Sequence, residues 1–575
     1  MSRSPSKPSS SPGTIRAQLA AGYARDGYWS DEVLWDWVTR NARARGNAPA
    51  LKTWGGVITY AELTQRALAC AAGLRALGIS KGDVVAVQLP NIPEFVVAYL
   101  AITRLGAVMQ TMHMPYRAAD IEVLLAHSGA KAMVCMSKSG DFVGAETCLA
   151  LRARLPQLRA VIAVGAAAPD SAHAFDSLQQ AAMADTLGHA HGLSGADDFL
   201  LLYTSGTTAS PKGVPHAYRD FLANARLSAR ELSVEAHDVL LPVAPFTHLY
   251  GLFAVNMALA SGACVALLPA FTPPELARAL RELKPTIAFT APAHIAACLN
   301  AKLFDGIDLS HMKYVQISGS AVPPALARAL EPMLTGGRVM QLWGMTELQA
   351  GAYTRLTDSE AVRAETTGRA SPGTDLRVVD GDGAVLAMTT ASDTVSVPRA
   401  GANSDRTTGA ALASTEGELQ MRGPSLFEGY RNNAAATAES FTPDGWFRTG
   451  DLAVIDADGN TRLTGRVKDI INRGGVKFNP LDIEALLQKH PAIAEVAIAP
   501  LPDALLGERA CCFAVLKAGA ALDLEGVRAY LEALGVNKIK WPERFECVTA
   551  MPLTPTRKII KSALIAQLYA TESTA

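Results

Sequence analysis

Short apolar runs alternate with longer amphipathic stretches along most of this 575-residue chain, and this alternation limits the fold more than any other feature. Runs such as Val84–Leu89, Ala132–Met136 and Val265–Pro269 are typical of buried strands. Between them lie helical patterns such as Ala61–Gly78, which is apolar on one side and ends in glycine, a common helix stop. We therefore predict an α/β fold with mostly parallel sheets covered by helices.

A chain of this length needs several domains, or one large body with an appendage. Residues 1–15 are rich in Ser and Pro and lack the apolar segment of a secretion signal, so we predict a disordered tail. A large body of several subdomains is expected over 16–465, interrupted by a polar, aperiodic insertion at 387–415. A fresh pattern then predicts a small, mobile α+β domain over 466–575.

Charge and cysteine content exclude several classes of protein. Lys and Arg total 53 and Asp and Glu total 54, so no general basic field attracts nucleic acid. The longest apolar stretch, Leu252–Phe271, is interrupted by Asn256 and Ser261-Gly262, which favours a buried helix–turn–strand over a membrane span. The eight cysteines form no CxxC pair or zinc-type cluster, which is typical of core thiols in a reducing cytoplasm.

A candidate phosphate-binding loop lies at Tyr203–Gly213, directly after the apolar run Phe199–Leu202. Hydroxyls and free backbone N–H groups can hold phosphate oxygens, glycine allows close approach and lysine supplies a positive charge. The spacing differs from that of a Walker A loop. On composition alone, a flexible surface loop fits equally well. The residues concerned are Thr204, Ser205, Gly206, Thr207, Thr208 and Lys212.

The loop sequence YTSGTTASPKG resembles the YTSGTTGxPKG signature of the adenylate-forming superfamily, which includes acyl-CoA and aryl-CoA synthetases, aryl-acid adenylation enzymes and luciferases. Ala209 stands where that signature has glycine. Further segments resemble motifs of the superfamily in the same order. Within the superfamily, the chain most resembles cyclohexanecarboxylate, aryl-acid or medium-chain acid–CoA ligases. These segments are SGSAVPP (318–324), QLWGMTE (341–347), GWFRTGDL (445–452), GRVKDIINRGG (465–475) and PLTPTRKIIKSAL (552–564), with Trp343 in place of tyrosine and Arg557 in place of glycine.

The resemblance implies a role for each matched residue. Thr346 would contact the α-phosphate of ATP and Glu347 would bind Mg²⁺, which is consistent with the repulsion between a carboxylate and a triphosphate unless a divalent cation bridges them. Lys558 would bridge the acyl carboxylate and the α-phosphate. The remaining implied roles are ribose binding by Asp451 and Arg466, the base and acyl pocket at Gly319, Ser320 and Ala321, cofactor binding at Trp343 and Gly344, the pantetheine tunnel at Gly474 and Gly475, and a domain hinge at Asp469.

The acyl side carries a further match, because PFTHLYG (245–251) resembles the segment in which His248 would gate the acyl pocket. A core histidine is the plain alternative. Enzymes selecting 2-hydroxyaryl acids typically have His-Asn here, whereas Leu249 cannot hydrogen-bond a ring hydroxyl. We therefore expect an apolar alicyclic, aromatic or medium-chain acid rather than dihydroxybenzoate or salicylate. No aspartate stands where it would pair with an amino acid's ammonium group.

The expected function is that of an acid–thiol ligase dependent on ATP and Mg²⁺, forming an acyl-adenylate, releasing pyrophosphate and then making an acyl-CoA thioester and AMP. One alternative is a stand-alone adenylation enzyme that loads the phosphopantetheine of a carrier protein. A non-catalytic binding protein is a second alternative, which retention of Glu347, Asp451, Arg466 and Lys558 argues against. The expected partners are the acid, ATP and CoA; a carrier protein and a homodimer are left open.

Overall fold

The computed structural model describes residues 12–166, 168–179, 192–204, 211–390, 395–396, 415–474, 476–503, 505–554 and 558–574. The chain divides into two compact units. The first comprises Met1–Asp375, Thr389–Thr394 and Met421–Phe447, and the second comprises Leu376–Met388, Val395–Gln420 and Arg448–Ala575. Most of the predicted insertion at 387–415 lies outside the described residues, and the predicted boundary at residue 465 stays a prediction.

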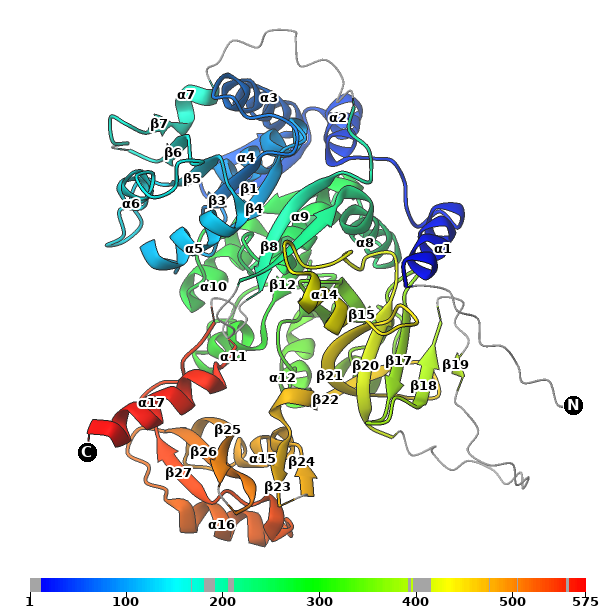
Figure 1. Cartoon of the computed structure of the whole chain (residues 1–575), viewed down its shortest axis with the longest axis vertical. Helices are drawn as coiled ribbons and strands as arrows, with labels where there is room; N and C mark the ends of the chain where they lie inside the picture. The colour runs from blue at the N-terminus through cyan, green and yellow to red at the C-terminus, as the bar shows by residue number, and fades with distance from the viewer. Residues whose placement is uncertain are drawn as a thin grey trace, which may run out of the picture. The chain divides into compact units, whose positions relative to one another are not determined.

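The first sheet of the first unit has seven strands in the order β7-β6-β5-β3-β4-β8-β9 (Figure 1). All neighbouring strands are parallel except the last pair, β8 and β9. The strands are β3 (Val84–Gln88), β4 (Val108–Thr111), β5 (Ala132–Met136), β6 (Ala160–Val164), β7 (His173–Ala174), β8 (Asp198–Thr204) and β9 (Lys212–Ala217).

The second sheet has nine strands in the order β16-β15-β14-β13-β12-β10-β11-β1-β2, parallel in its centre and antiparallel at both edges. The strands are β1 (Pro49–Thr53), β2 (Gly56–Thr59), β10 (Val239–Pro242), β11 (Cys264–Ala266), β12 (Ile287–Thr290), β13 (Tyr314–Ile317), β14 (Arg338–Met345), β15 (Gln349–Tyr353) and β16 (Arg369–Ala370).

Helices cover these sheets on both faces, as buried parallel strands require. One core cluster combines residues of both sheets with α3, α4, α8 and α9, so these helices lie between the sheets. The helices of this unit are α1 (Pro12–Arg25), α2 (Leu34–Arg45), α3 (Tyr60–Ala76), α4 (Pro93–Arg104), α5 (Ala118–Ser128), α6 (Gly144–Leu151), α7 (Phe175–Gln179), α8 (Tyr218–Glu231), α9 (Leu249–Ser261), α10 (Pro273–Leu283), α11 (Pro292–Asn300), α12 (Pro324–Leu330), η1 (Glu331–Leu334), α13 (Glu360–Glu365) and α14 (Ala434–Ser440).

The second unit contains two sheets. One has the order β19-β18-β17-β20-β21-β22, and the other has β24-β23-β26-β25 with β27 beside β26. Helices α15 and α16 pack on one face of the second sheet and α17 on the other. The elements are β17 (Asp375–Val379), β18 (Val385–Thr389), β19 (Val395–Ser396), β20 (Gly417–Arg422), β21 (Phe447–Ile455), β22 (Thr461–Arg466), η2 (Val467–Asp469), β23 (Ile471–Arg473), β24 (Val476–Phe478), α15 (Pro480–Leu487), β25 (Ile493–Asp503), β26 (Gly507–Leu516), α16 (Leu524–Ala533), η3 (Lys538–Lys540), β27 (Arg544–Cys547) and α17 (Lys561–Thr574).

The predicted fold class is confirmed, and local chemistry explains where elements begin and end. The predicted helix at Ala61–Gly78 is α3, which starts where the Thr59 hydroxyl and the Glu62 carboxylate form a reciprocal capping box. The predicted helix–turn–strand at Leu252–Phe271 is α9 followed by β11, with Gly262 turning the chain at a φ of 72°. No helix within the described ranges is both long and apolar enough to cross a membrane.

Helix α1 begins inside the predicted N-terminal tail, and residues 1–11 lie outside the described part of the chain.

Two buried amides in the first unit differ in their partners. Asn91 donates to the carbonyls of Pro242 and Ala244 at 3.3 and 3.1 Å, and its Oδ1 accepts from the backbone N–H of Phe246 at 2.7 Å. Gln316 on β13 is fully buried, yet neither its Nε2 nor its Oε1 has a hydrogen-bond partner among the described residues. Asn91 therefore ties α4 to the loop after β10, whereas the Gln316 amide contributes no such bond.

We predict that Asn91→Leu lowers the free energy of unfolding by about 2–4 kcal/mol, because buried backbone groups lose their partners. Gln316→Leu removes an amide that has no partner in the described part of the chain and should change that free energy by less than about 1 kcal/mol. Chemical unfolding of the two variants beside the parent protein measures both values. An equal loss in both variants would show that the Gln316 amide does have a partner.

Candidate active site

The hydroxyl-rich loop joins the antiparallel strands β8 and β9, whose last and first residues, Thr204 and Lys212, are direct partners in the ladder. Both residues are half-buried. The loop therefore starts and ends at one fixed point of the sheet edge. The predicted loop residues Ser205, Gly206, Thr207 and Thr208, together with Ala209, lie outside the described residues.

Glu347 lies in the turn between β14 and β15, and its side chain is buried. Its Oε1 accepts a hydrogen bond from the Tyr430 hydroxyl at 2.8 Å, and its backbone carbonyl accepts one from the N–H of Phe427 at 2.8 Å. Burial raises the pKa of the Glu347 carboxyl group, while the Tyr430 hydroxyl and the charges of His216 and Lys212 oppose that rise. The Tyr430 phenol is neutral, so it does not neutralise the charge of the buried Glu347 carboxylate. A cation bound beside this carboxylate would lower the cost of burying it.

Tyr430 also connects Glu347 to the hydroxyl-rich loop. The ammonium group of Lys212 lies 5.1 Å from the centre of the Tyr430 ring, within the range of a cation–π interaction. The structure thus brings two predicted site residues, Glu347 and Lys212, to one aromatic side chain. Tyr430 could not be identified from the sequence, because nothing in its local sequence indicates a contact 83 positions away.

The predicted nucleotide-side residues Trp343 and Gly344 lie at the end of β14. A Cβ atom on Gly344 would come within 1.9 Å of the Gln349 carbonyl oxygen, so only glycine fits the hairpin. Trp343 is buried, and a Cβ atom on Gly351 would come within 2.4 Å of its ring. Gly351 therefore provides the space for a tryptophan where the superfamily motif has tyrosine.

His248 is the N-terminal capping residue of α9, and its Nδ1 accepts a hydrogen bond from the backbone N–H of Tyr250 at 3.2 Å. The His113 ring stacks on it at a centroid distance of 6.2 Å, and His113 Nδ1 lies 2.9 Å from the Thr247 hydroxyl. His248 is half-buried, whereas His113 is buried. His113 could not be identified from the sequence, because it is distant from His248 in the chain and belongs to no motif.

The loop after β13 carries the three small residues predicted for the adenine and acyl side. Gly319 has a φ of 99°, a conformation that favours glycine, and is half-buried. Ser320 and Ala321 are exposed. All three follow the carboxyl end of a parallel strand, the edge at which ligands of such sheets bind.

The second unit places the two predicted ribose-binding residues together. Asp451 and Arg466 are direct partners on the antiparallel strands β21 and β22, and Arg466 Nε donates to Asp451 Oδ1 at 2.6 Å. The backbone N–H of Asp451 donates to the Thr449 hydroxyl at 3.1 Å. The Asp451 carboxylate is buried, with the half-buried guanidinium beside it.

The other predicted residues of the second unit follow Arg466. Asp469 ends the short helix η2 directly after β22. Gly474 has a φ of 58° and donates its N–H to the Leu506 carbonyl at 2.7 Å, while Gly475 lies outside the described ranges. Lys558 is exposed, and its backbone N–H donates to the Thr554 hydroxyl at 3.0 Å. Arg557 is not among the described residues.

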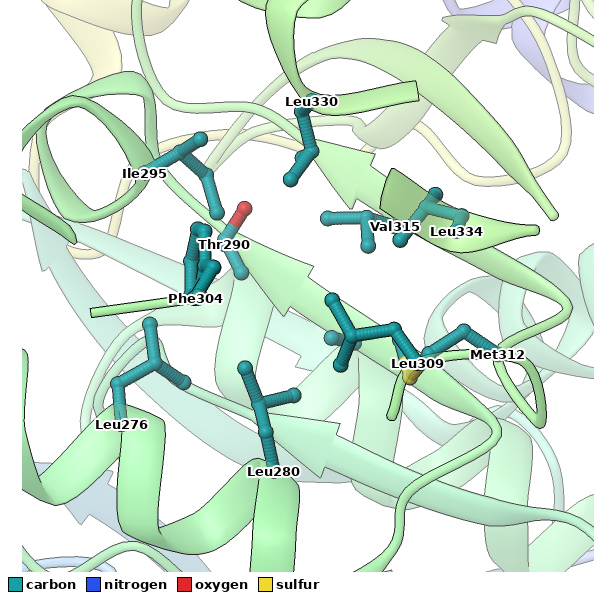
Figure 2. A pocket seen from close by; sticks show the side chains of 11 residues that line it. Leu276, Leu280, Thr290, Ile295, Phe304, Leu309, Met312, Val315, Leu330 and Leu334 are labelled. Atoms are coloured by element: carbon teal, nitrogen blue, oxygen red, sulfur yellow. The ribbon is translucent and has the colours of Figure 1, made fainter. Parts of the chain in front are cut away.

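An apolar cavity lies among the side chains between the nine-stranded sheet and helices α10 to α12 (Figure 2). Its volume of about 20 Å³ is enough for one water molecule and too small for a carboxylic acid substrate. Thr290 carries its one polar side chain, and its other lining residues belong to the core on the sheet face opposite α9. We therefore assign this cavity to core packing.

Across the described part of the chain, no group of three or more His, Cys, Asp or Glu side chains is arranged to hold a metal ion.

Comparison with known proteins gives consistent matches over both units. A family model described as AMP-binding enzyme matches residues 38–431, and one described as AMP-binding enzyme C-terminal domain matches residues 482–558. The salicyl-AMP ligase / salicyl-S-ArCP synthetase of Mycobacterium tuberculosis is 34% identical over 564 residues, covering 96% of this chain and 94% of that protein. The medium-chain fatty-acid–CoA ligase of Escherichia coli is 31% identical over 556 residues, covering 96% and 93%.

Solved structures agree with these matches. The apo structure of MbtA from Mycobacterium smegmatis has a TM-score of 0.69 at 31% identity, covering 96% of this chain and 98% of that one. The ATP-bound structure of MatB from Rhodopseudomonas palustris has a TM-score of 0.78 at 26% identity, covering 92% and 98%.

The buried imidazole of His113 gives a prediction about pH. Burial lowers the pKa of His113 to about 4 from an ordinary value of 6.5. Between these two pH values the unfolded chain binds the proton and the folded protein does not. The free energy of unfolding is therefore not reduced by His113 above pH 6.5, and it falls as the pH drops from 6.5 toward 4. His113→Gln, which can still hydrogen-bond Thr247, should remove up to about 3 kcal/mol of this pH dependence.

Unfolding of the parent protein and of the His113→Gln variant, measured across the same pH window, checks this expectation. Identical pH dependence in the two proteins would contradict it.

Proposed function

Because the chain belongs to the AMP-binding enzymes, ATP-using ligases that adenylate aryl or acyl acids, we propose that it activates an apolar carboxylic acid and transfers the acyl group to CoA. The acid would be alicyclic, aromatic or medium-chain. The observation that carries the proposal is the buried carboxylate of Glu347, joined through Tyr430 to Lys212 at the base of the hydroxyl-rich loop.

The chemistry explains why such a site is needed. A carboxylate is a poor acyl donor, since its leaving group would be oxide. Attack of a carboxylate oxygen on the α-phosphorus of ATP forms a new P–O bond, breaks the bond to the β-phosphate and releases pyrophosphate. The CoA thiolate then attacks the acyl carbon, the C–S bond forms, and AMP leaves with one oxygen of the original carboxylate. The first step demands charge neutralisation more than a protein nucleophile.

We assign a role in the first step to each of the following residues. Mg²⁺ held by Glu347 would neutralise the triphosphate charge, which fits a buried carboxylate beside a neutral phenol. Thr346 would contact the α-phosphate, and Lys558 would neutralise charge on the acid and the α-phosphate. The Asp451 carboxylate, oriented by Arg466, can accept hydrogen bonds from the vicinal hydroxyls of the ribose.

The second step would follow a change of domain orientation about Asp469, which withdraws Lys558 and brings Gly474 and Gly475 to the pantetheine of CoA. A short helical turn directly after a strand, where Asp469 lies, is a position that can absorb a change in backbone angles. This assignment also explains why one enzyme can run two chemically different half-reactions in sequence.

The choice of acid rests on the N-terminus of α9. His248 caps that helix and is half-buried, while the neighbouring Leu249 is buried and offers no hydrogen bond to a ring hydroxyl. An apolar acid fits this pair better than salicylate does. The relatives' names include both a salicyl-AMP ligase and a medium-chain fatty-acid–CoA ligase, so the family accommodates either class.

A second candidate function is loading of a carrier protein, favoured by the 34% identity to a salicyl-S-ArCP synthetase. A panel of acids, assayed by pyrophosphate release and by thioester formation with CoA or with a phosphopantetheinylated aryl carrier protein, separates the two. We expect kcat/KM for apolar acids to exceed that for salicylate by about 10-fold or more, with CoA as the productive acceptor. Thioester formation with the carrier protein alone would overturn the CoA assignment.

Removing the Lys558 ammonium group should affect one half-reaction only. We expect Lys558→Ala to slow acid-dependent pyrophosphate release by about 100-fold or more, in line with the loss of one stabilising charge at a transition state. Thioester formation from preformed acyl-adenylate should remain within about 3-fold, because that step no longer involves the α-phosphate charge.

Lys540→Ala is the matched control, since Lys540 pairs with Asp482 at 3.3 Å in the same unit and has no assigned role. Equal loss of both half-reactions in Lys558→Ala would contradict the assignment of Lys558 to adenylation.

A further inference from the structure

The turn that carries Thr346 and Glu347 is attached to the start of α8 by a buried polar network. His216, the penultimate residue of β9, lies with its Nε2 at 2.8 Å from the Thr346 carbonyl oxygen. Its Nδ1 lies 3.2 Å from Asp220 Oδ1, in the first turn of α8. Both side chains are buried, so water does not compete for these bonds.

The chemistry of these groups fixes the direction of the bonds. A carbonyl oxygen only accepts, so His216 Nε2 must carry the proton that binds Thr346. The other ring nitrogen either donates to the Asp220 carboxylate or accepts from the protonated acid, and both forms keep the same contacts. Asp220 Oδ2 also accepts from the backbone N–H of Ala217 at 3.1 Å, which fixes the carboxyl group relative to β9.

The far end of the same turn is attached to the same place. Gln349, whose φ of 62° is unusual for a residue other than glycine, donates from its side chain to the Asp220 carbonyl at 3.1 Å. One helical turn further along α8, Asn224 exchanges two hydrogen bonds with the backbone of Ala350, at 2.9 and 3.2 Å. The hairpin therefore remains anchored through Gln349 and Asn224 when the His216 bond is lost.

We propose that His216 and Asp220 are positioning residues, which hold the Thr346 peptide so that Thr346 and Glu347 face the triphosphate and its Mg²⁺ in the adenylation step. His216 acts through the carbonyl of Thr346, and Asp220 acts through the His216 ring that it orients. The inference rests on the proposed function for its catalytic consequence, but the positional claim stands on contacts within the first unit alone.

The test compares His216→Leu, which keeps the volume but cannot donate, with His216→Gln, whose amide nitrogen can donate to the same carbonyl. His294→Leu is the matched control, because His294 is also buried in the first unit and its Nδ1 accepts from the N–H of Ala291, outside the site. Two readouts are measured for each purified variant: backbone hydrogen exchange of residues 345–349 in the ligand-free protein, and the kinetics of pyrophosphate release.

In His216→Leu we expect exchange in the turn to rise about 10-fold, consistent with the loss of one buried hydrogen bond. The Mg²⁺ concentration for half-maximal pyrophosphate release should also rise about 10-fold, while KM for the acid and thioester formation from preformed acyl-adenylate stay within about 2-fold. His216→Gln should recover most of both changes, and His294→Leu should show neither.

Unchanged exchange and unchanged Mg²⁺ dependence in His216→Leu would overturn the proposal. Equal effects in His294→Leu, or no recovery in His216→Gln, would also overturn it by reducing His216 to general packing. If the parent protein released no pyrophosphate with any acid, the proposed function would fail, and the exchange experiment would still decide whether His216 holds the turn.

Discussion

The buried carboxylate of Glu347 is the constraint on which the candidate active site depends. Removing a carboxylate from water is costly unless hydrogen bonds or a cation compensate, and here the neutral hydroxyl of Tyr430 donates one such bond. That pairing requires Tyr430, from the segment Met421–Phe447, to reach a hairpin built much earlier in the chain. Lys212 then lies over the same ring. The fold of the first unit therefore brings the side chains of Glu347, Tyr430 and Lys212 together.

The hairpin that carries Glu347 has a tightly constrained backbone. Gly344 has no room for a side chain, and Gln349 adopts a left-handed conformation although it is not glycine. A turn of this kind holds its shape only when its surroundings determine it. The buried contacts from His216, Asp220 and Asn224 supply that support from α8 and β9. These contacts hold the Glu347 turn in one arrangement, and groups held in this way need no reorganisation when charge develops beside them.

The alternation of apolar runs and amphipathic helices was enough to predict the fold class, and motif order was enough to predict the family, because both signals are local in the sequence. The structure brings the predicted residues Lys212 and Glu347 to one tyrosine and pairs Asp451 with Arg466. Their catalytic and binding roles stay predictions. Tyr430, His216, Asp220 and His113 could not be found this way, because each acts through a contact with a distant segment and carries no motif of its own. Helix α1 was not predicted either, because the Ser- and Pro-rich sequence before it indicated disorder.

In the proposed reaction, a carboxylate oxygen of the acid becomes bonded to the α-phosphorus of ATP. Reaction of an accepted acid labelled with ¹⁸O in both carboxylate oxygens, followed by mass spectrometry of the products, follows that oxygen. We expect AMP to carry one ¹⁸O atom and pyrophosphate to carry none, because the bond between the labelled oxygen and the α-phosphorus survives acyl transfer. Label in inorganic phosphate with formation of ADP, or unlabelled AMP, would contradict it.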